Sequence, residues 1–313
     1  MVRKLLPNRV RRTYLGGGRI DAFCGTHVVS GPQPLPEDWL ASTTTAFNGR
    51  VEIAGEGLGC LEDGRAVRDV VGELPILVKL LDSDERLVIQ AHPTVTYARE
   101  HFNSPVGKTE CWYFLPGTAP DACVYLGFKP GVTRKRWQAA FRAQNGLLDF
   151  LHRVPVQAGD FVFVDGGVPH AIGGGCFMIE LQEPSDLMVV AERVTPSGRE
   201  IPDRKMHGGL GGEEMFNVYD YDGVEAETLY ARYVRRQAHG RIVGPDLTDK
   251  FAMQLLAGGD RCRLAGVPAV AVVVSGEGAL NGVPVRRGDR FLVAGEDEVR
   301  MEGTVAAVVS FKG

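Results

Sequence analysis

The sequence contains no uninterrupted apolar run of about 18 residues, the length that predicts a helix able to cross a bilayer. The N-terminal segment is rich in arginine but lacks the apolar stretch of a secretory signal. A formal net charge of −4 gives no electrostatic reason to expect a nucleic-acid partner. The six cysteines form no Cys-x-x-Cys pair and no compact framework, which favours reduced thiols. We therefore expect a cytoplasmic protein that binds neither membranes nor nucleic acid.

Several common catalytic motifs are also missing. The sequence has no Gly-x-x-x-x-Gly-Lys-Ser/Thr phosphate loop and no Gly-x-Ser-x-Gly nucleophile turn. The glycines at 55, 57 and 59 do not complete a dinucleotide-binding fingerprint. These absences argue against nucleotide-dependent enzymes and α/β-hydrolases.

Glycine and proline, in contrast, are plentiful. Forty glycines and eighteen prolines separate many short β-branched runs, which predicts a mostly β architecture. We expect helices at 93–101, with a proline in its first turn, and at 133–142, with Thr133 as N-cap. These helices and the amphipathic stretch 147–153 would form a small helical insertion. Strands are expected at 76–81, 87–90, 110–115, 122–128, 160–164 and 176–182, with the turn-rich first 38 residues wrapped around them.

The pattern changes near residue 238. Short strands separated by glycine turns are expected at 251–257, 269–275, 289–294 and 304–311. The only histidine of this part, His239, precedes all four strands. We predict two units: residues 1–237, which hold the functional side chains, and residues 238–313, which hold no metal and cover an edge of the first unit.

Three strand-like segments carry side chains that could bind a divalent metal. Gln90 and His92 follow an apolar run and lie two residues apart, so on a strand they point to the same face. Glu110 begins the second segment, and His170 ends the third. Two imidazoles, a carboxylate and an amide oxygen suit a metal site inside a β-barrel. Zinc fits this ligand set, and so do manganese, iron, cobalt and nickel. A single histidine or glutamate is more often packed or solvated, so the prediction depends on the joint pattern.

The third segment has a recognisable phrase. Its Gly-Asp, Gly and Pro-x-His elements, within 159–170, resemble the second conserved motif of cupins, in which a proline turn brings a ligand histidine into the barrel. Similar phrasing recurs at 274–291 without a ligand residue. The resemblance implies two cupin-type (jelly-roll) β-barrels.

Longer sequence motifs narrow the resemblance to one family. Residues 90–93, 107–113 and 168–173 are similar to class I mannose-6-phosphate isomerases, in particular the short bacterial form. The Gly-Gly-Gly turn at 16–18 and the Tyr-Asp-Tyr phrase at 219–221 also match. The resemblance implies an isomerase that interconverts mannose 6-phosphate and fructose 6-phosphate, and hence a sugar phosphate as the ligand. We expect a monomer or homodimer. The implied ligands of one Zn²⁺ per chain are Gln90, His92, Glu110 and His170.

Aldose–ketose isomerisation needs a base that moves a proton between C1 and C2. Lys79 lies in an apolar strand, where it reaches the rim or points into a polar cavity; in a cavity, desolvation would lower its pKa toward that of a base. The resemblance places a pocket lysine there. Glu180 is a second catalytic candidate, with a hydrogen-bonded residue at the barrel mouth as the alternative. Lys108, two residues before Glu110, is a candidate for substrate binding, with a solvated strand end as the alternative.

One position departs from the resemblance. Short-form members carry an essential arginine four residues after the aspartate of a Ser/Thr-Asp phrase, and here that position is Val190. Arg193 could replace this arginine only if a bulge or a helical turn changed its direction. Three hypotheses follow: the same isomerase using Arg193 as a catalytic residue, an isomerase of another sugar or sugar phosphate, or a non-catalytic sugar-sensing cupin.

Overall fold

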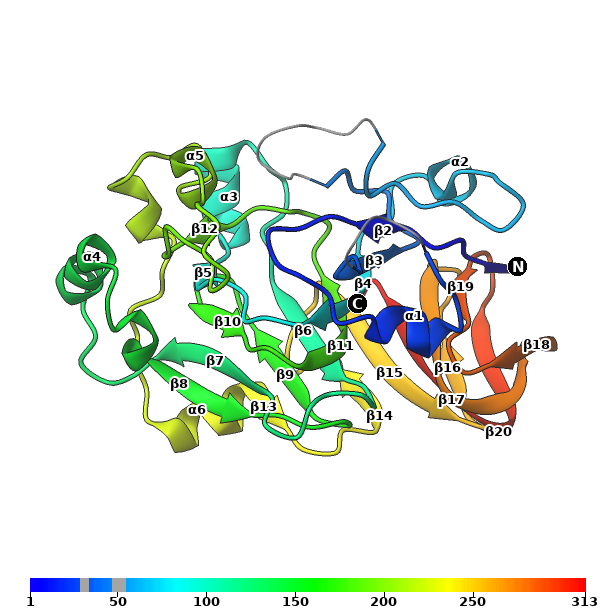
Figure 1. Cartoon of the computed structure of the whole chain (residues 1–313). Coiled ribbons are helices and arrows are strands. Elements are labelled where there is room, and N and C mark those ends of the chain that lie inside the picture. Colours follow the sequence, from blue (N-terminus) through cyan, green and yellow to red (C-terminus); the bar gives the residue numbers. More distant parts are fainter. Residues whose placement is uncertain (29–33, 47–54) are drawn as a thin grey trace.

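The computed structural model describes residues 1–28, 34–46 and 55–313, and within them the strands form three antiparallel sheets (Figure 1). The first sheet has the order β12 (Val189–Val190), β5 (Gln90–Ala91), β10 (His170–Ile172), β7 (Cys123–Phe128) and β8 (Leu151–Pro155). The second has the order β13 (Val234–Arg235), β9 (Phe161–Val164), β6 (Glu110–Phe114), β11 (Cys176–Gln182), β4 (Leu77–Ser83), β3 (Glu37–Leu40) and β2 (Arg9–Val10).

The third sheet contains most of the C-terminal strands. Its order is β1 (Val2–Lys4), β19 (Arg290–Val293), β17 (Ala269–Leu280), β20 (Glu298–Phe311), β15 (Ala252–Ala257) and β14 (Gly240–Val243), with β16 (Arg261–Arg263) paired to β20 and β18 (Val283–Arg286) paired to β17. Together the three sheets confirm the prediction of a mostly β protein with a cupin-like fold.

Side-chain alternation in the second sheet explains how the layers pack. Trp112 and Phe114 of β6 share a core with Val124 and Leu126 of β7, which belongs to the first sheet. The residues that alternate with them along β6, such as Tyr113, point to the other face and pack against the third sheet. Because neighbouring residues of a strand point to opposite faces, one sheet supplies both cores. The interior between the first two sheets is the cupin-type barrel that holds the candidate site.

The third sheet closes around a core of its own, which includes Ala271, Phe291 and Val309. It lies against the outer face of the second sheet, so the expectation that it covers only an edge is wrong. The change of sheet falls between β13 and β14, close to residue 238. However, β1 pairs with β19, and the first strand therefore lies in the C-terminal sheet. The division at 237/238 remains a prediction.

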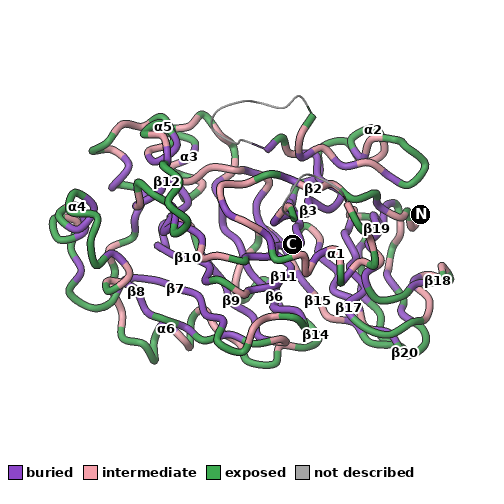
Figure 2. Tube along the Cα trace, viewed as in Figure 1, coloured by how far each residue is buried: buried purple, intermediate pink, exposed green. Residues whose placement is uncertain are grey.

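The helices gather mainly on the outer side of the first sheet (Figure 1). Thr94 and Thr133 cap α3 (Val95–Phe102) and α4 (Arg134–Ala143) by accepting a hydrogen bond from the backbone N–H three residues on, which confirms the predicted N-cap at Thr133. Figure 2 shows the exposed side of these helices facing away from the buried sheet. The other helical segments are α1 (Arg19–Cys24), α2 (Val67–Val71), η1 (Leu147–Phe150), α5 (Asp203–Met206), η2 (Glu214–Asn217) and α6 (Ala226–Tyr233).

Two further sequence predictions concern thiols and membranes. All six cysteines are free, as predicted. Within the described residues, no helix combines the length and the apolar character needed to cross a bilayer.

Candidate metal centre and adjoining cavity

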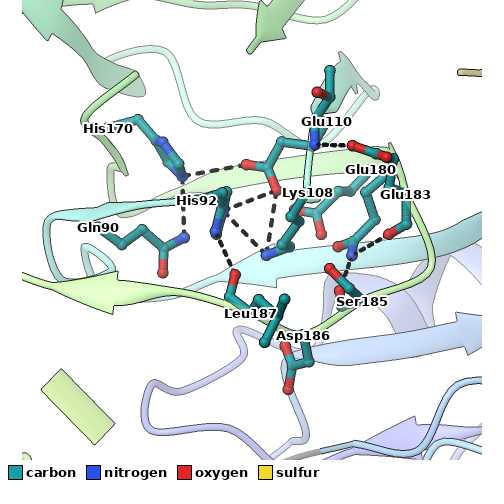
Figure 3. A network of polar contacts seen from close by, with 12 residues as sticks. Gln90, His92, Lys108, Glu110, His170, Glu180, Glu183, Ser185, Asp186 and Leu187 are labelled. Carbon is teal, nitrogen blue, oxygen red and sulfur yellow. Dashed lines mark hydrogen bonds and ion pairs between the residues drawn. The ribbon is translucent and has the colours of Figure 1, made fainter. Parts of the chain in front are cut away.

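The predicted metal ligands meet inside the first barrel (Figure 3). The metal-binding atoms of His92, Glu110 and His170 all lie within 4.8 Å of one another, and the three residues are buried. Nε2 of His92 is 3.2 Å from Glu110, and Nε2 of His170 is 3.3 Å from it. The side-chain amide of Gln90 lies 3.2 Å from Nε2 of His170, and its oxygen and nitrogen exchange places by a simple flip.

Strand pairing explains why these predicted ligands lie close together. His170 begins β10 rather than ending a strand, and it pairs directly with Gln90 of β5. Glu110 begins β6 and comes from the opposite sheet. His92 follows β5, and the loop that leads into β6 packs against the backbone of Pro93. A Cβ on Gly107 would come within 2.6 Å of the Pro93 carbonyl oxygen, so this close approach requires glycine.

Hydrogen bonds fix the orientation of both imidazoles. Nδ1 of His92 donates to the Leu187 carbonyl and Nδ1 of His170 donates to the Val168 carbonyl, each over 2.9 Å. This tautomer leaves Nε2 of each ring without a proton and directed at the cluster, as in most protein metal sites.

The charge state of the cluster also suits a metal ion. Burial, together with Lys108, lowers the pKa of His92 to about 3, and burial lowers the pKa of His170 as well. Burial opposes ionisation of Glu110, but the ammonium of Lys108 holds its pKa well below its ordinary value. Both carboxylate oxygens of Glu110 are buried without a hydrogen-bond partner. Orphaned buried acceptors of this kind fit a site that receives a cation.

Lys108 lies beside this cluster. Its Nζ is 3.1 Å from Nε2 of His92 and 3.4 Å from Glu110. It precedes β6 rather than lying within a strand, yet it points to the same side as Glu110. The solvated alternative is wrong, because Lys108 is buried.

Lys79 and Glu180 form a second polar group in the barrel. They are direct cross-strand partners on β4 and β11, and Nζ of Lys79 lies 2.6 Å from Glu180. Burial opposes the charge of Lys79, but the carboxylates of Glu180 and Glu37 raise its pKa above the ordinary value. The expectation that desolvation dominates and lowers this pKa is therefore wrong, because two carboxylates accompany the lysine into the barrel. Burial raises the pKa of Glu180, with Lys79 acting in the opposite direction.

One cavity connects these groups. It encloses about 640 Å³ of space free of protein atoms, a figure that includes open solvent at its mouth. Among the predicted site residues, Lys79, Gln90, Lys108 and Glu180 line it. The residues around them include Arg12, Tyr14, Glu37, Arg86, Met188, Val190, Thr195, Ile201 and Lys205.

Arg193 is not brought to this cavity. β12 ends at Val190, and the backbone N–H of Arg193 donates to the side chain of Gln144. The guanidinium lies over the ring of Phe141, 5.2 Å from its centroid, and the residue is exposed. The chain does not make the bulge that would redirect Arg193, whereas Val190 itself lines the cavity.

Other charged residues of the cavity were missed by sequence reasoning. Arg12 makes two 2.8 Å hydrogen bonds to Asp186, and its Nε lies 3.2 Å from Glu37. Glu37 also accepts hydrogen bonds from Tyr14 and Trp39. Glu37 begins a strand of sequence Glu-Asp-Trp-Leu that is not an apolar run, and Arg12 has basic neighbours, so nothing in the local sequence distinguished either residue.

The structure combines a mostly β, cupin-like fold with a barrel-enclosed group of side chains that could hold a divalent metal. The resemblance to mannose-6-phosphate isomerases is confirmed by comparison with known proteins. The chain is 39% identical over 112 residues to mannose-6-phosphate isomerase ManA of Bacillus subtilis, a match that covers 36% of this chain and 35% of that protein. It is 38% identical over 112 residues to mannose-6-phosphate isomerase of Streptococcus mutans, covering 36% and 34%.

These sequence matches span about a third of the length of the curated relatives. No family model matches the chain. The structural similarity extends much further: a crystal structure of mannose 6-phosphate isomerase from Bacillus subtilis superimposes with a TM-score of 0.75 at 20% identity, over 99% of both chains. This similarity establishes that the whole chain has that fold.

Proposed function

We propose that the protein is a metal-dependent aldose–ketose isomerase that interconverts mannose 6-phosphate and fructose 6-phosphate. The carrying observation is a cavity lined by the Lys79–Glu180 pair and by Gln90 and Lys108, which contact the buried cluster of nitrogen and oxygen donors. The similarity to proteins named mannose-6-phosphate isomerase supports this substrate.

Gln90, His92, Glu110 and His170 would hold the metal, which we propose to be Zn²⁺, one ion per chain. When bound, a divalent metal polarises the sugar oxygens and so stabilises an enediol. Lys108 lies beside the cluster and would offer its ammonium to a substrate oxygen, because a bound metal would take the Nε2 lone pair of His92 that it contacts now. The similarity to isomerases and the donor set of the cluster support this assignment.

Glu180 is the proposed base. It would remove the proton from C2 of the aldose and return it to C1, while the hydroxyl proton of O2 passes to O1. Lys79 remains protonated and donates a hydrogen bond to Glu180. The raised pKa of Glu180 favours this assignment, because a base whose pKa lies closer to neutrality returns its proton more readily. Lys79 is therefore proposed as the partner that orients Glu180, and Lys79→Met is expected to retain the metal and lose turnover.

The test is a coupled assay of purified, metal-analysed protein with mannose 6-phosphate, following fructose 6-phosphate. Chelator-sensitive turnover of roughly 1–10³ per second, the usual enzymatic range, would support the proposal. Absence of turnover in metal-loaded protein would refute it for this substrate. The exposed Arg193 supplies a control, because Arg193→Met is expected to leave turnover unchanged.

Val190 favours two alternatives. A valine on the cavity wall, where the short bacterial form carries arginine, suits a different sugar or sugar phosphate, or a sugar-sensing cupin without catalysis. Turnover of another aldose or ketose in a substrate panel would identify the first alternative. Saturable sugar binding without turnover of any sugar would identify the second.

A further inference from the structure

A second cation-bearing element faces the cavity beside Val190. The short helix α5 packs against β12, the strand that carries Val190. Lys205 of α5 is only 9% exposed, although it carries an ammonium group, and it lines the same cavity as Val190. Sequence reasoning did not identify it.

Among the described residues, the ammonium of Lys205 has no hydrogen bond and no ion pair. The two carboxylates that act on it, Asp186 and Glu37, both lie against Arg12. Burial and the like charge of Arg12 lower the pKa of Lys205 to about 8, while Asp186 and Glu37 act in the opposite direction. The lysine therefore remains mostly protonated near neutral pH. The ammonium is not among the fully enclosed polar atoms, and it reaches the cavity without a carboxylate partner in the described part of the chain, so an anion that enters the cavity can bind it.

The occupant must be able to lie beside the catalytic groups, because Lys205 shares its cavity with Lys79, Glu180 and Gln90. The nearby carboxylates of the protein, Asp186 and Glu37, are paired with Arg12. The anion that neutralises Lys205 is therefore expected to come from a ligand. A phosphate monoester at the far end of a sugar supplies the missing negative charge and accepts several hydrogen bonds from an ammonium.

We propose that Lys205 binds the phosphate group of the substrate and supplies, from α5, the positive charge that Val190 does not. The inference rests on the proposed function and deepens it, since it makes the protein specific for phosphorylated sugars.

Binding of inorganic phosphate to metal-loaded protein, measured by calorimetry, tests the inference without reliance on catalysis. Lys205→Met is expected to weaken phosphate binding at least tenfold, and Lys205→Arg is expected to retain it. The matched control is Arg204→Met, which removes an exposed cation one residue away on the same helix. Metal content and circular dichroism verify that each variant is folded, and Lys205→Gln serves if methionine disturbs the packing.

Equal phosphate affinity in wild type and Lys205→Met would overturn the inference, as would a wild-type protein that does not bind phosphate at millimolar concentration. If the isomerase is active, Lys205→Met should raise KM for mannose 6-phosphate at least tenfold and change kcat much less, and an unchanged KM would also overturn it. Phosphate binding that depends on Lys205 in a protein without isomerase turnover would leave this inference standing and refute the proposed function alone.

Discussion

Replacing Glu180 by glutamine removes the proposed base without removing a metal ligand. The amide keeps an oxygen that can accept the hydrogen bond from Lys79, now 2.6 Å long, but it cannot take a proton. Loss of a general base costs about 10²–10⁴-fold in turnover. That loss corresponds to about 2.7–5.4 kcal/mol of barrier, at roughly 1.36 kcal/mol per factor of ten.

The same substitution affects stability. Breaking a buried ion pair on one side costs about 3–5 kcal/mol when the remaining charge is left alone. Lys79 keeps a second carboxylate, Glu37, at 3.9 Å, so we expect the lower end of this range, about 3 kcal/mol. Metal content should stay at the wild-type value because the cluster of His92, Glu110 and His170 is untouched.

The measurements are the coupled isomerase assay, metal analysis and denaturant unfolding of Glu180→Gln. Asp160→Asn is a matched control, because Asp160 is also a buried carboxylate paired with a cation, Arg236, but does not line the cavity. This control should lose stability and keep turnover. Wild-type kcat in Glu180→Gln would refute the assignment of the base.

Three shorter predictions follow. His92→Ala should lose both metal and turnover, and stoichiometric metal in that variant would contradict the ligand assignment. Raising the pH from 7 to 9 carries Lys205 through its pKa of about 8, so wild-type phosphate affinity should fall about tenfold relative to that of Lys205→Arg, which shares the ionisation of phosphate itself; equal pH profiles would count against the anion site. Arg290→Met should lower the free energy of unfolding by about 3 kcal/mol, because Arg290 of the third sheet forms a buried ion pair, 3.2 Å long, with Asp38 of the second; an unchanged denaturation midpoint would contradict this.

Local patterns predicted half of the strands in the described residues, including the longest ones, because runs of apolar and β-branched residues mark them. β11 was predicted with the bounds that the structure gives it, and β4, β6 and β7 within two residues at either end. Short strands such as β1 and β12 were missed because three and two residues are too few to show a periodic pattern. β17 and β20 are longer than predicted, since glycines inside them were interpreted as turns.

The candidate metal cluster was predictable because its residues lie in recognisable sequence motifs. The second polar group was only partly predictable. The position of Lys79 in a strand was clear, but its pKa depends on Glu180 and Glu37, which the sheet register places beside it. Arg193 was assigned from proximity in sequence to Val190, whereas the basic residues that line the cavity come from distant segments, as Lys205 does.

The pairing of β1 with β19 joins the two ends of the sequence in one sheet. Loop closure over so long a segment is entropically unfavourable until the intervening strands have folded. We expect docking of β1 to be a late event in folding, so a reporter near Val2 would follow completion of the whole molecule rather than formation of either barrel. A fragment cut at residue 238 would leave β1 without its partner and expose an unpaired edge on β19, a site for association between chains.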